Sequence, residues 1–241
     1  MGGKRQKNQL RMVLAFTDEG RSEAPRARGE GTESPTAKRA CESPAIPEQV
    51  REEVCERENL KRALRRVKSN QGSPGIDGRK VEELPGYLKQ HWPTIREQLL
   101  RGSYEPQPVR RVEIPKPDGG VRKLGIPTVL DRFIQPAVMQ VLQGRWDRTF
   151  SEPSHGFRPG RSAQQAVHKA QQYVREGRHG VVDLDREKFF DRVNHDRLRK
   201  SVSRRLADQR MLRMIGAFLK AGVRENGLVS AVEEGTPPGG P

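Results

Sequence analysis

Hydrophobic residues recur at three- and four-residue intervals in four segments, which predicts helices that each bury one face. The first segment has apolar positions 60, 63, 64 and 67, and the second has 130, 133, 134, 137, 138, 141 and 142. The third has 163, 166, 167, 170 and 173, and the fourth extends from Asp196 to Ala221. Pro136 is expected to kink the second helix or to mark its first turn. A capping box of Ser162 and Gln165 opens the third helix, and Gly177 ends it.

Shorter signals predict the remaining elements. A capping box from Thr94 to Glu97 predicts a short helix that ends before Gly102. Two β-rich runs flank Asp118-Gly119 in VRRVEIPKPDGGVRKLGIP, which predicts a hairpin with a tight turn. The last segment, GLVSAVEEGTPPGGP, is typical of a short hairpin that leads into a turn. Helices and strands in this order predict an α+β fold.

The run GVVDLD predicts a strand with two chemically different faces. Val182 and Leu184 fall on one face, and Asp183 and Asp185 fall on the other. Paired carboxylates are hard oxygen ligands for Mg²⁺, which two-metal centres use in phosphoryl and nucleotidyl transfer. Alternatively, the two aspartates are solvated at the strand end or paired with nearby arginines. The spacing alone favours this second interpretation.

Composition and charge indicate which kind of molecule the protein binds. The chain has 241 residues and a formal net charge of +15, and 32% of its residues are hydrophobic. Such an excess of cations favours polyanions, above all a nucleic-acid backbone, although it also serves solubility. No apolar run approaches the roughly 18–20 residues that a membrane span needs, so a soluble, intracellular protein without a membrane partner is expected. Residues 17–47 have too little apolar surface to order and are predicted to be disordered.

Five blocks occur in a fixed order along the chain: SPGIDG, VEIPKPDGGVRKLGIPTVLDR, HGFRPGRSAQQAV, DLDREKFFDRVNHD and GLVSAVEEGTPPGGP. Together, from Leu60 to Pro241, they closely resemble the N-terminal half of bacterial group II intron reverse transcriptases, also called maturases. The resemblance implies the fingers and part of the palm of a right-hand polymerase. It divides the chain into a disordered tail at 1–47, an N-terminal helical extension at 48–108, fingers at 109–178 and a partial palm at 179–241.

The resemblance also implies a nucleotide site. The family motif D-x-x-x-F-F-D aligns its metal-binding aspartate with Asp185, and Arg186 would add its main-chain carbonyl to a Mg²⁺ ion. Phe190 would lie under the sugar of the incoming dNTP and exclude a 2′-hydroxyl, while Phe189 would belong to the core. Arg122 and Lys116 resemble the basic residues that clamp the triphosphate, since a guanidinium binds phosphate bidentately. A solvated position at the hairpin end is the alternative for Lys116.

Contacts with RNA are implied for three further regions. The helix beginning near Leu60 would supply phosphate contacts through Arg65, Arg66 and Lys68, and Gly75 lies in SPGIDG, whose family counterpart approaches the template. In HGFRPGRS, Arg158 and Arg161 would touch template or intron RNA, or would bridge the loop to carboxylates. The implied partners are intron RNA, an RNA template with a DNA primer, and dNTP. A cytoplasmic, ribonucleoprotein-associated protein of a bacterium is expected, and a homodimer is left open.

Two departures from the family pattern limit the expected activity. Pro238 stands where the family has a glutamine that borders the nucleotide pocket, and proline offers neither a side-chain amide nor a backbone N–H. The block with Tyr-Ala-Asp-Asp, whose aspartates complete the metal site, does not occur in the sequence. The implied function is therefore an RNA-directed DNA polymerase that also binds intron RNA for splicing and mobility, but is inactive as this chain alone. The alternatives are a non-catalytic fragment that binds intron RNA, and an inert product.

Overall fold

The computed structural model describes residues 49–115, 117, 119–178, 180–186, 189–225, 227–232 and 234–236. The disorder predicted for residues 17–47, together with Lys116 and Pro238, lies outside this description. None of the described helices is both long enough and apolar enough to cross a membrane. The longer helices are α1 (Val50–Val54), α2 (Arg57–Asn70), α3 (Leu84–Arg101), α4 (Val129–Trp146), α5 (Ala163–Arg175), α6 (His195–Ser203) and α7 (Gln209–Lys220). Three single turns are η1 (Val81–Glu83), η2 (Asp147–Thr149) and η3 (Phe190–Arg192), and the strands are β1 (Val109–Pro115), β2 (Val121–Ile126), β3 (Val223–Glu225) and β4 (Leu228–Ser230).

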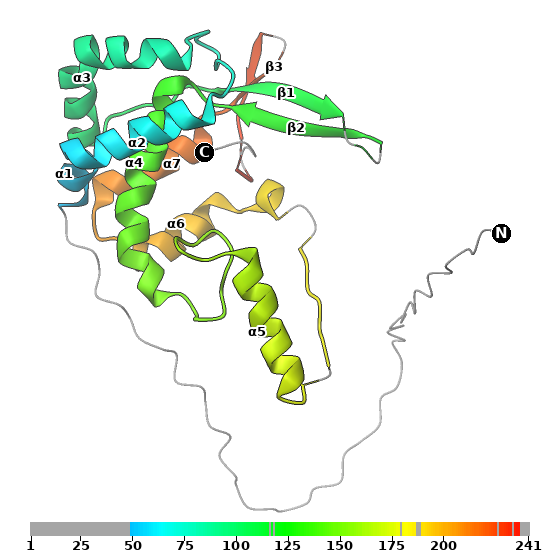
Figure 1. Ribbon diagram of the computed structural model, residues 1–241. Helices are drawn as coiled ribbons and strands as arrows, with labels where there is room; N and C mark the ends of the chain where they lie inside the picture. The colour runs from blue at the N-terminus through cyan, green and yellow to red at the C-terminus, as the bar shows by residue number, and fades with distance from the viewer. Residues whose placement is uncertain are drawn as a thin grey trace, which may run out of the picture. The chain divides into compact units, whose positions relative to one another are not determined.

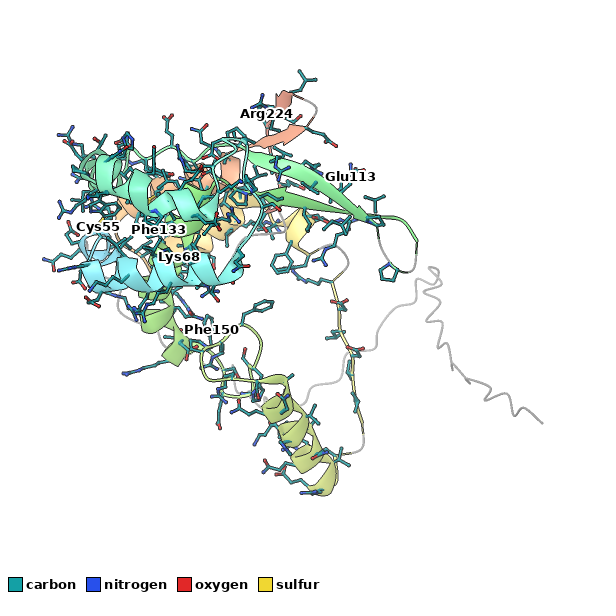
Figure 2. The ribbon with its side chains drawn as sticks, turned by 45° about the horizontal axis from the view of Figure 1, so that its top comes forward. Cys55, Lys68, Glu113, Phe133, Phe150 and Arg224 are labelled. Atoms are coloured by element: carbon teal, nitrogen blue, oxygen red, sulfur yellow. The ribbon has the colours of Figure 1, made fainter. Side chains whose placement is uncertain are left out.

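One hydrophobic core joins the helices α1, α2, α3, α4 and α7 (Figure 1). Its largest fully buried side chain is Phe133 of α4, labelled in Figure 2, whose ring meets Trp92 of α3 edge to face. The predicted apolar face of α2 is confirmed, because Ala63 and Val67 are buried. Asn59 ties the helices together, since its amide donates to the carbonyls of Val54 and Ala137 at 3.0 and 2.9 Å.

A buried carboxylate fixes the start of α4. Thr128 caps the helix by accepting from the Asp131 amide at 3.1 Å. The Asp131 carboxylate in turn accepts from the Thr128 hydroxyl, the Tyr104 hydroxyl and the Gln107 amide at 2.6, 2.8 and 3.2 Å. Burial raises the pKa of Asp131, while the three donors oppose that rise. Pro136, expected to kink α4 or to mark its first turn, lies inside a helix that continues to Trp146.

The four described strands form one mixed sheet in the order β2-β1-β3-β4. The predicted β1–β2 hairpin is confirmed, and Arg110 to Pro115 pair antiparallel with Ile126 to Val121. β3 pairs parallel to β1 and antiparallel to β4. The final hairpin starts earlier than the predicted segment, because its first strand, β3, precedes Gly227. The α+β class is confirmed.

Two boundary predictions were wrong for identifiable reasons. Helix α3 begins at Leu84, so the capping signal at Thr94 lies inside it, and Pro93 is accommodated within the helix. Pro85 near its first turn suits a helix start, because the amide that proline lacks has no partner there. The predicted end is confirmed, since Gly102 adopts φ +68° and stops the helix after Arg101. The segment from Asp196 to Ala221 divides into α6 and α7, and Asp208 caps α7.

The region from α5 to residue 186 differs most from its prediction. The capping box of Ser162 and Gln165 is confirmed, yet no residue of α5 is buried. GVVDLD is not a strand: residues 180–186 carry no ladder pairing, and Val181, Val182 and Leu184 are 85%, 83% and 89% exposed. A strand requires a neighbouring chain for its backbone groups. Within the described residues no segment pairs with this one, and Figure 1 draws it without an arrow.

Candidate functional site

Arg122 lies on β2, the edge strand of the sheet. In the antiparallel register Arg122 is opposite Ile114, so the two share a face, while Lys123 is opposite Glu113 on the other face. The Lys123 ammonium lies 3.7 Å from the Glu113 carboxylate. Arg122 is exposed and pairs with no carboxylate in the described part of the chain. Its guanidinium is therefore available to an anion.

The second wall is built from two segments that are far apart in sequence, the turn η3 and residues 234–236. The turn η3 presents Phe190, which is 55% exposed and meets Phe189 edge to face at 5.3 Å between ring centroids. Phe189, expected in the core, is itself 48% exposed, because no apolar layer within the described residues covers this turn. Residues 234–236 lie against the same turn. The amide of Thr236 donates to the Phe190 carbonyl, and that of Gly235 donates to the Val193 carbonyl, both at 2.8 Å.

A cavity of about 860 Å³ separates these two walls. Arg122 and Phe190, predicted from the sequence to serve one nucleotide, both line it. Its charged lining residues are Arg111, Arg122, Lys123, Asp191 and Glu234. The buried Nε of Arg111 forms an ion pair with the Glu225 carboxylate at 3.8 Å, and it has no hydrogen-bond partner within the described residues. Two arginines and one exposed aromatic ring thus border the same cavity.

Asp185 and Arg186 are not brought to this cavity. Both are exposed in residues 180–186, and neither is among the cavity's described lining residues. The Asp185 carboxylate accepts a hydrogen bond from the Arg186 amide at 2.8 Å, which fixes only its own rotamer. Across the described ranges no group of three or more acidic, histidine or cysteine side chains is arranged to hold a metal ion. One carboxylate and one carbonyl fill only part of the octahedral coordination that Mg²⁺ requires.

The loop with Gly75 is anchored to the fold. Arg132, buried in α4, donates from Nη2 to the Ser73 carbonyl at 2.7 Å, and Arg110 of β1 donates to the Pro74 carbonyl at 3.0 Å. A Cβ on Gly75 would lie 2.6 Å from the Thr128 Cα. The close backbone approach expected of this glycine is therefore to the protein itself. An RNA contact by the rest of the loop remains a prediction.

The predicted RNA-contacting cations divide into two kinds. Arg65, Arg66 and Lys68 are exposed on α2, as phosphate contacts require. Arg158 instead points inward, with a side chain only 8% exposed, and forms a two-pronged pair with Asp147 at 2.9 and 3.1 Å. This hydrogen bonding holds the pKa of Asp147 below its ordinary value.

Arg158 also donates to the main-chain carbonyls of Asp147, Ser151 and Ser154. Its donors are therefore occupied, which favours the bridging alternative stated for this residue. Arg161 is half-buried in the same loop, and its contact with RNA remains a prediction.

Sequence reasoning missed two residues of the site. Arg111 stands in no motif of its own, and its place beside the cavity depends on the pairing of β1 with β3. His195 opens α6 after the Asn194 cap, and its Nε2 lies 2.6 Å from the carbonyl of Gly235. The Asn194 cap could have placed His195 in the first helical turn. No sequence signal links it to a residue 40 positions later.

Comparison with known proteins places the chain in a family. The sequence profile described as "Reverse transcriptase (RNA-dependent DNA polymerase)" matches residues 114–241, more than half of the chain. Protein YkfC of Escherichia coli (strain K12) is 37% identical over 194 residues, which cover 78% of this chain and 51% of YkfC. Group II intron-encoded protein LtrA of Lactococcus lactis subsp. cremoris is 35% identical over 179 residues, covering 74% of this chain and 30% of LtrA. The chain thus spans about half the length of one relative and under a third of the other.

A solved structure is similar in fold. One chain of the partial Cas6-RT-Cas1--Cas2 complex superposes with a TM-score of 0.51 at 21% identity, covering 78% of this chain and 31% of that chain. At this identity the similarity concerns the fold alone, and it agrees with the fingers and palm of a polymerase. From the matching profile, the intron-encoded relatives and the shared fold, the chain belongs to the reverse transcriptase (RNA-dependent DNA polymerase) family, in its group II intron-encoded branch.

Proposed function

We propose that this chain contributes the incoming-nucleotide site of an RNA-directed DNA polymerase that acts on group II intron RNA. In that reaction the primer 3′-hydroxyl attacks the α-phosphorus of a dNTP, the bond to the bridging oxygen of the β-phosphate breaks, and pyrophosphate leaves. Residues 109–178 act as fingers and residues 179–241 as part of the palm. The whole reaction belongs to the longer proteins that relatives of this chain represent, because the chain spans only part of their length.

The observation that carries this proposal is the cavity shared by Arg122 and Phe190. A deoxynucleoside triphosphate has an anionic end and a sugar with no 2′-hydroxyl. The unpaired guanidinium of Arg122 suits the anionic end, since it can donate two parallel hydrogen bonds to phosphate oxygens. The exposed ring of Phe190 suits the sugar, because a flat apolar surface leaves an added hydroxyl without a hydrogen-bond partner. Lys116 is proposed as a second triphosphate ligand, and Pro238 as a border of the base pocket.

Nucleic acid is the partner class that family membership indicates, and we propose intron RNA and an RNA template paired with a DNA primer. The exposed cations of α2 support phosphate contacts, with Arg65, Arg66 and Lys68 on the solvent side of the core. The family generally depends on divalent metal, and we propose Mg²⁺ with Asp185 as its first carboxylate ligand. The protein would then act with its RNA in the bacterial cytoplasm.

Equilibrium binding of a fluorescent dNTP to the chain tests the nucleotide site. Arg122→Ala removes a charge-assisted pair and is expected to weaken binding by about tenfold, since such a pair contributes roughly 1.5–3 kcal/mol before solvent screening. Arg224→Ala is the matched control, because Arg224 is an exposed cation of the same sheet, on β3, and is not among the cavity's described lining residues (Figure 2). Equal losses in the two variants would mean that the sheet attracts nucleotides only through its general charge.

A further inference from the structure

Two stretches of main chain, residues 190–195 and 234–236, meet at the second wall of the cavity. The amides of Gly235 and Thr236 donate to the carbonyls of Val193 and Phe190 at 2.8 Å each. The first of these hydrogen bonds belongs to an isolated antiparallel bridge between Asn194 and Glu234. A third contact is made by a side chain: the Nε2 of His195 lies 2.6 Å from the Gly235 carbonyl. We call this set of contacts the 195–235 latch.

His195 is suited to this role by burial and by chemistry. Its side chain belongs to the first turn of α6, and the residue is only 4% exposed. A carbonyl oxygen only accepts, so the 2.6 Å contact requires Nε2 to carry the proton and to donate it. The Asn194 cap holds the start of the helix by accepting from the Arg197 amide at 2.9 Å. The imidazole thus extends from the fixed start of α6 to residues 234–236, which belong to no helix or strand.

Gly235 allows residues 234–236 to lie in direct contact with the turn η3. Its φ of +83° falls in the left-handed region that favours glycine. A Cβ at this position would lie 2.6 Å from the carbonyl oxygen of Asp191 and 2.9 Å from its carbonyl carbon. Both atoms belong to the main chain and cannot move aside without moving η3. Any side chain at position 235 would therefore separate the loop from the turn that carries Phe190.

We propose that His195 is a positioning residue for the nucleotide pocket: through the 195–235 latch it fixes residues 234–236 against the turn that presents Phe190. Phe190, Asp191, Glu234, Gly235 and Thr236 all line the cavity, whereas His195 lies behind them and is not among its described lining residues. The latch sets the distance between the sugar side of the pocket and the loop leading to Pro238. Its effect on nucleotide affinity rests on the proposed function, while its effect on the loop does not.

The test is amide hydrogen exchange at Gly235 and Thr236, measured in the whole chain for the wild type and for His195→Leu and His195→Gln. Leucine fills similar space without a donor, whereas the glutamine amide nitrogen stands near the position of Nε2 and can donate to the same carbonyl. Losing one buried hydrogen bond should accelerate exchange at both amides by about tenfold in His195→Leu. His195→Gln should stay within about threefold of the wild type. His168→Leu, an exposed histidine of α5, is the matched control and should change neither amide.

A second variant, at Gly235, tests the 195–235 latch from the loop that His195 contacts. Gly235→Ala should accelerate exchange at Thr236 to a similar degree, even if His195→Leu does not fold. Unchanged protection at both amides in either folded variant, or a glutamine variant as fast as the leucine variant, would overturn the proposal.

The dNTP and RNA affinities of the same proteins separate positioning from general stability. His195→Leu should weaken dNTP binding by about threefold to tenfold and leave RNA affinity unchanged, because the latch touches only the nucleotide side. Equal weakening of both affinities would mean that His195 only supports the fold, and would contradict the proposal. If the wild type binds no dNTP while the exchange pattern follows the expectation, the nucleotide site fails and the latch stands.

Discussion

Helices α4 and α5 come from the same kind of sequence pattern and end in opposite environments. Both have apolar residues at helical spacing, and each begins at a side-chain cap, Thr128 and Ser162 respectively. Nine residues of α4 are buried, and none of α5 is. The difference shows that periodicity and capping determine a helix and its apolar face. Whether that face becomes buried depends on a second surface, which the other helices of the hydrophobic core supply for α4.

The largest expected difference between the two helices is in the cost of truncating their apolar side chains. Phe133→Ala in α4 empties a site that is 1% exposed and should cost about 3–5 kcal/mol of unfolding free energy. Val167→Ala in α5, at a residue 57% exposed, should change it by less than about 0.5 kcal/mol. Urea unfolding followed by circular dichroism measures both. A cost above about 1 kcal/mol for Val167→Ala would show that α5 has a partner surface in solution.

The exposed cations of α2 and the inward-pointing Arg158 before α5 should differ in their effect on RNA binding. Replacing Arg65, Arg66 and Lys68 with alanine should lower the slope of log affinity against log salt by about 2 for single-stranded RNA, since each neutralised phosphate contributes roughly 0.7. Arg158→Ala should change the slope by less than about 0.5, because its donors are occupied within the protein. Filter binding at several salt concentrations measures the slope. A larger change for Arg158 than for the α2 triple variant would reverse the assignment.

The smallest expected effect is a pH dependence of stability, and it comes from Asp131 in the buried α4. Burial raises the folded-state pKa of Asp131 above its ordinary value, so the carboxyl's contribution to stability is complete below that ordinary value and is lost as pH rises through the folded pKa. Asp131→Asn removes this titration and keeps an acceptor for Tyr104. Relative to the wild type, the variant should therefore become progressively more stable as pH rises above about 4. Parallel stability curves for the two proteins would show that Asp131 does not titrate in this range.

The sequence predicted most of the local structure and only part of the spatial arrangement. The capping signal at Ser162, the β1–β2 hairpin and the apolar period of α2 each concern residues close in sequence, and each matches the structure. The strand at GVVDLD does not form, because a strand depends on backbone groups of another segment that no local pattern specifies. For the same reason the inward pairing of Arg158 remained one of two alternatives until its loop geometry was known.

In the candidate site, too, the sequence indicated some residues correctly but not how all of them are arranged in space. Resemblance to a family indicated Arg122 and Phe190, and the structure has them line one cavity. Asp185 was indicated by the same motif, yet it lies in residues 180–186, away from the described lining of that cavity. Contacts across 40 residues, such as that between His195 and Gly235, leave no period or spacing in the sequence.

Sugar discrimination tests the central claim, that the cavity between Arg122 and Phe190 holds a deoxynucleotide. The measurement compares the affinities of the chain for a dNTP and for the matching rNTP, in the wild type and in Phe190→Ala. If Phe190 lies under the sugar, the wild type should bind the dNTP at least about tenfold more tightly, a difference of about 1.4 kcal/mol, and the ratio should fall towards one in the variant. Equal affinities in the wild type, or a preference for the dNTP that survives Phe190→Ala, would contradict the account.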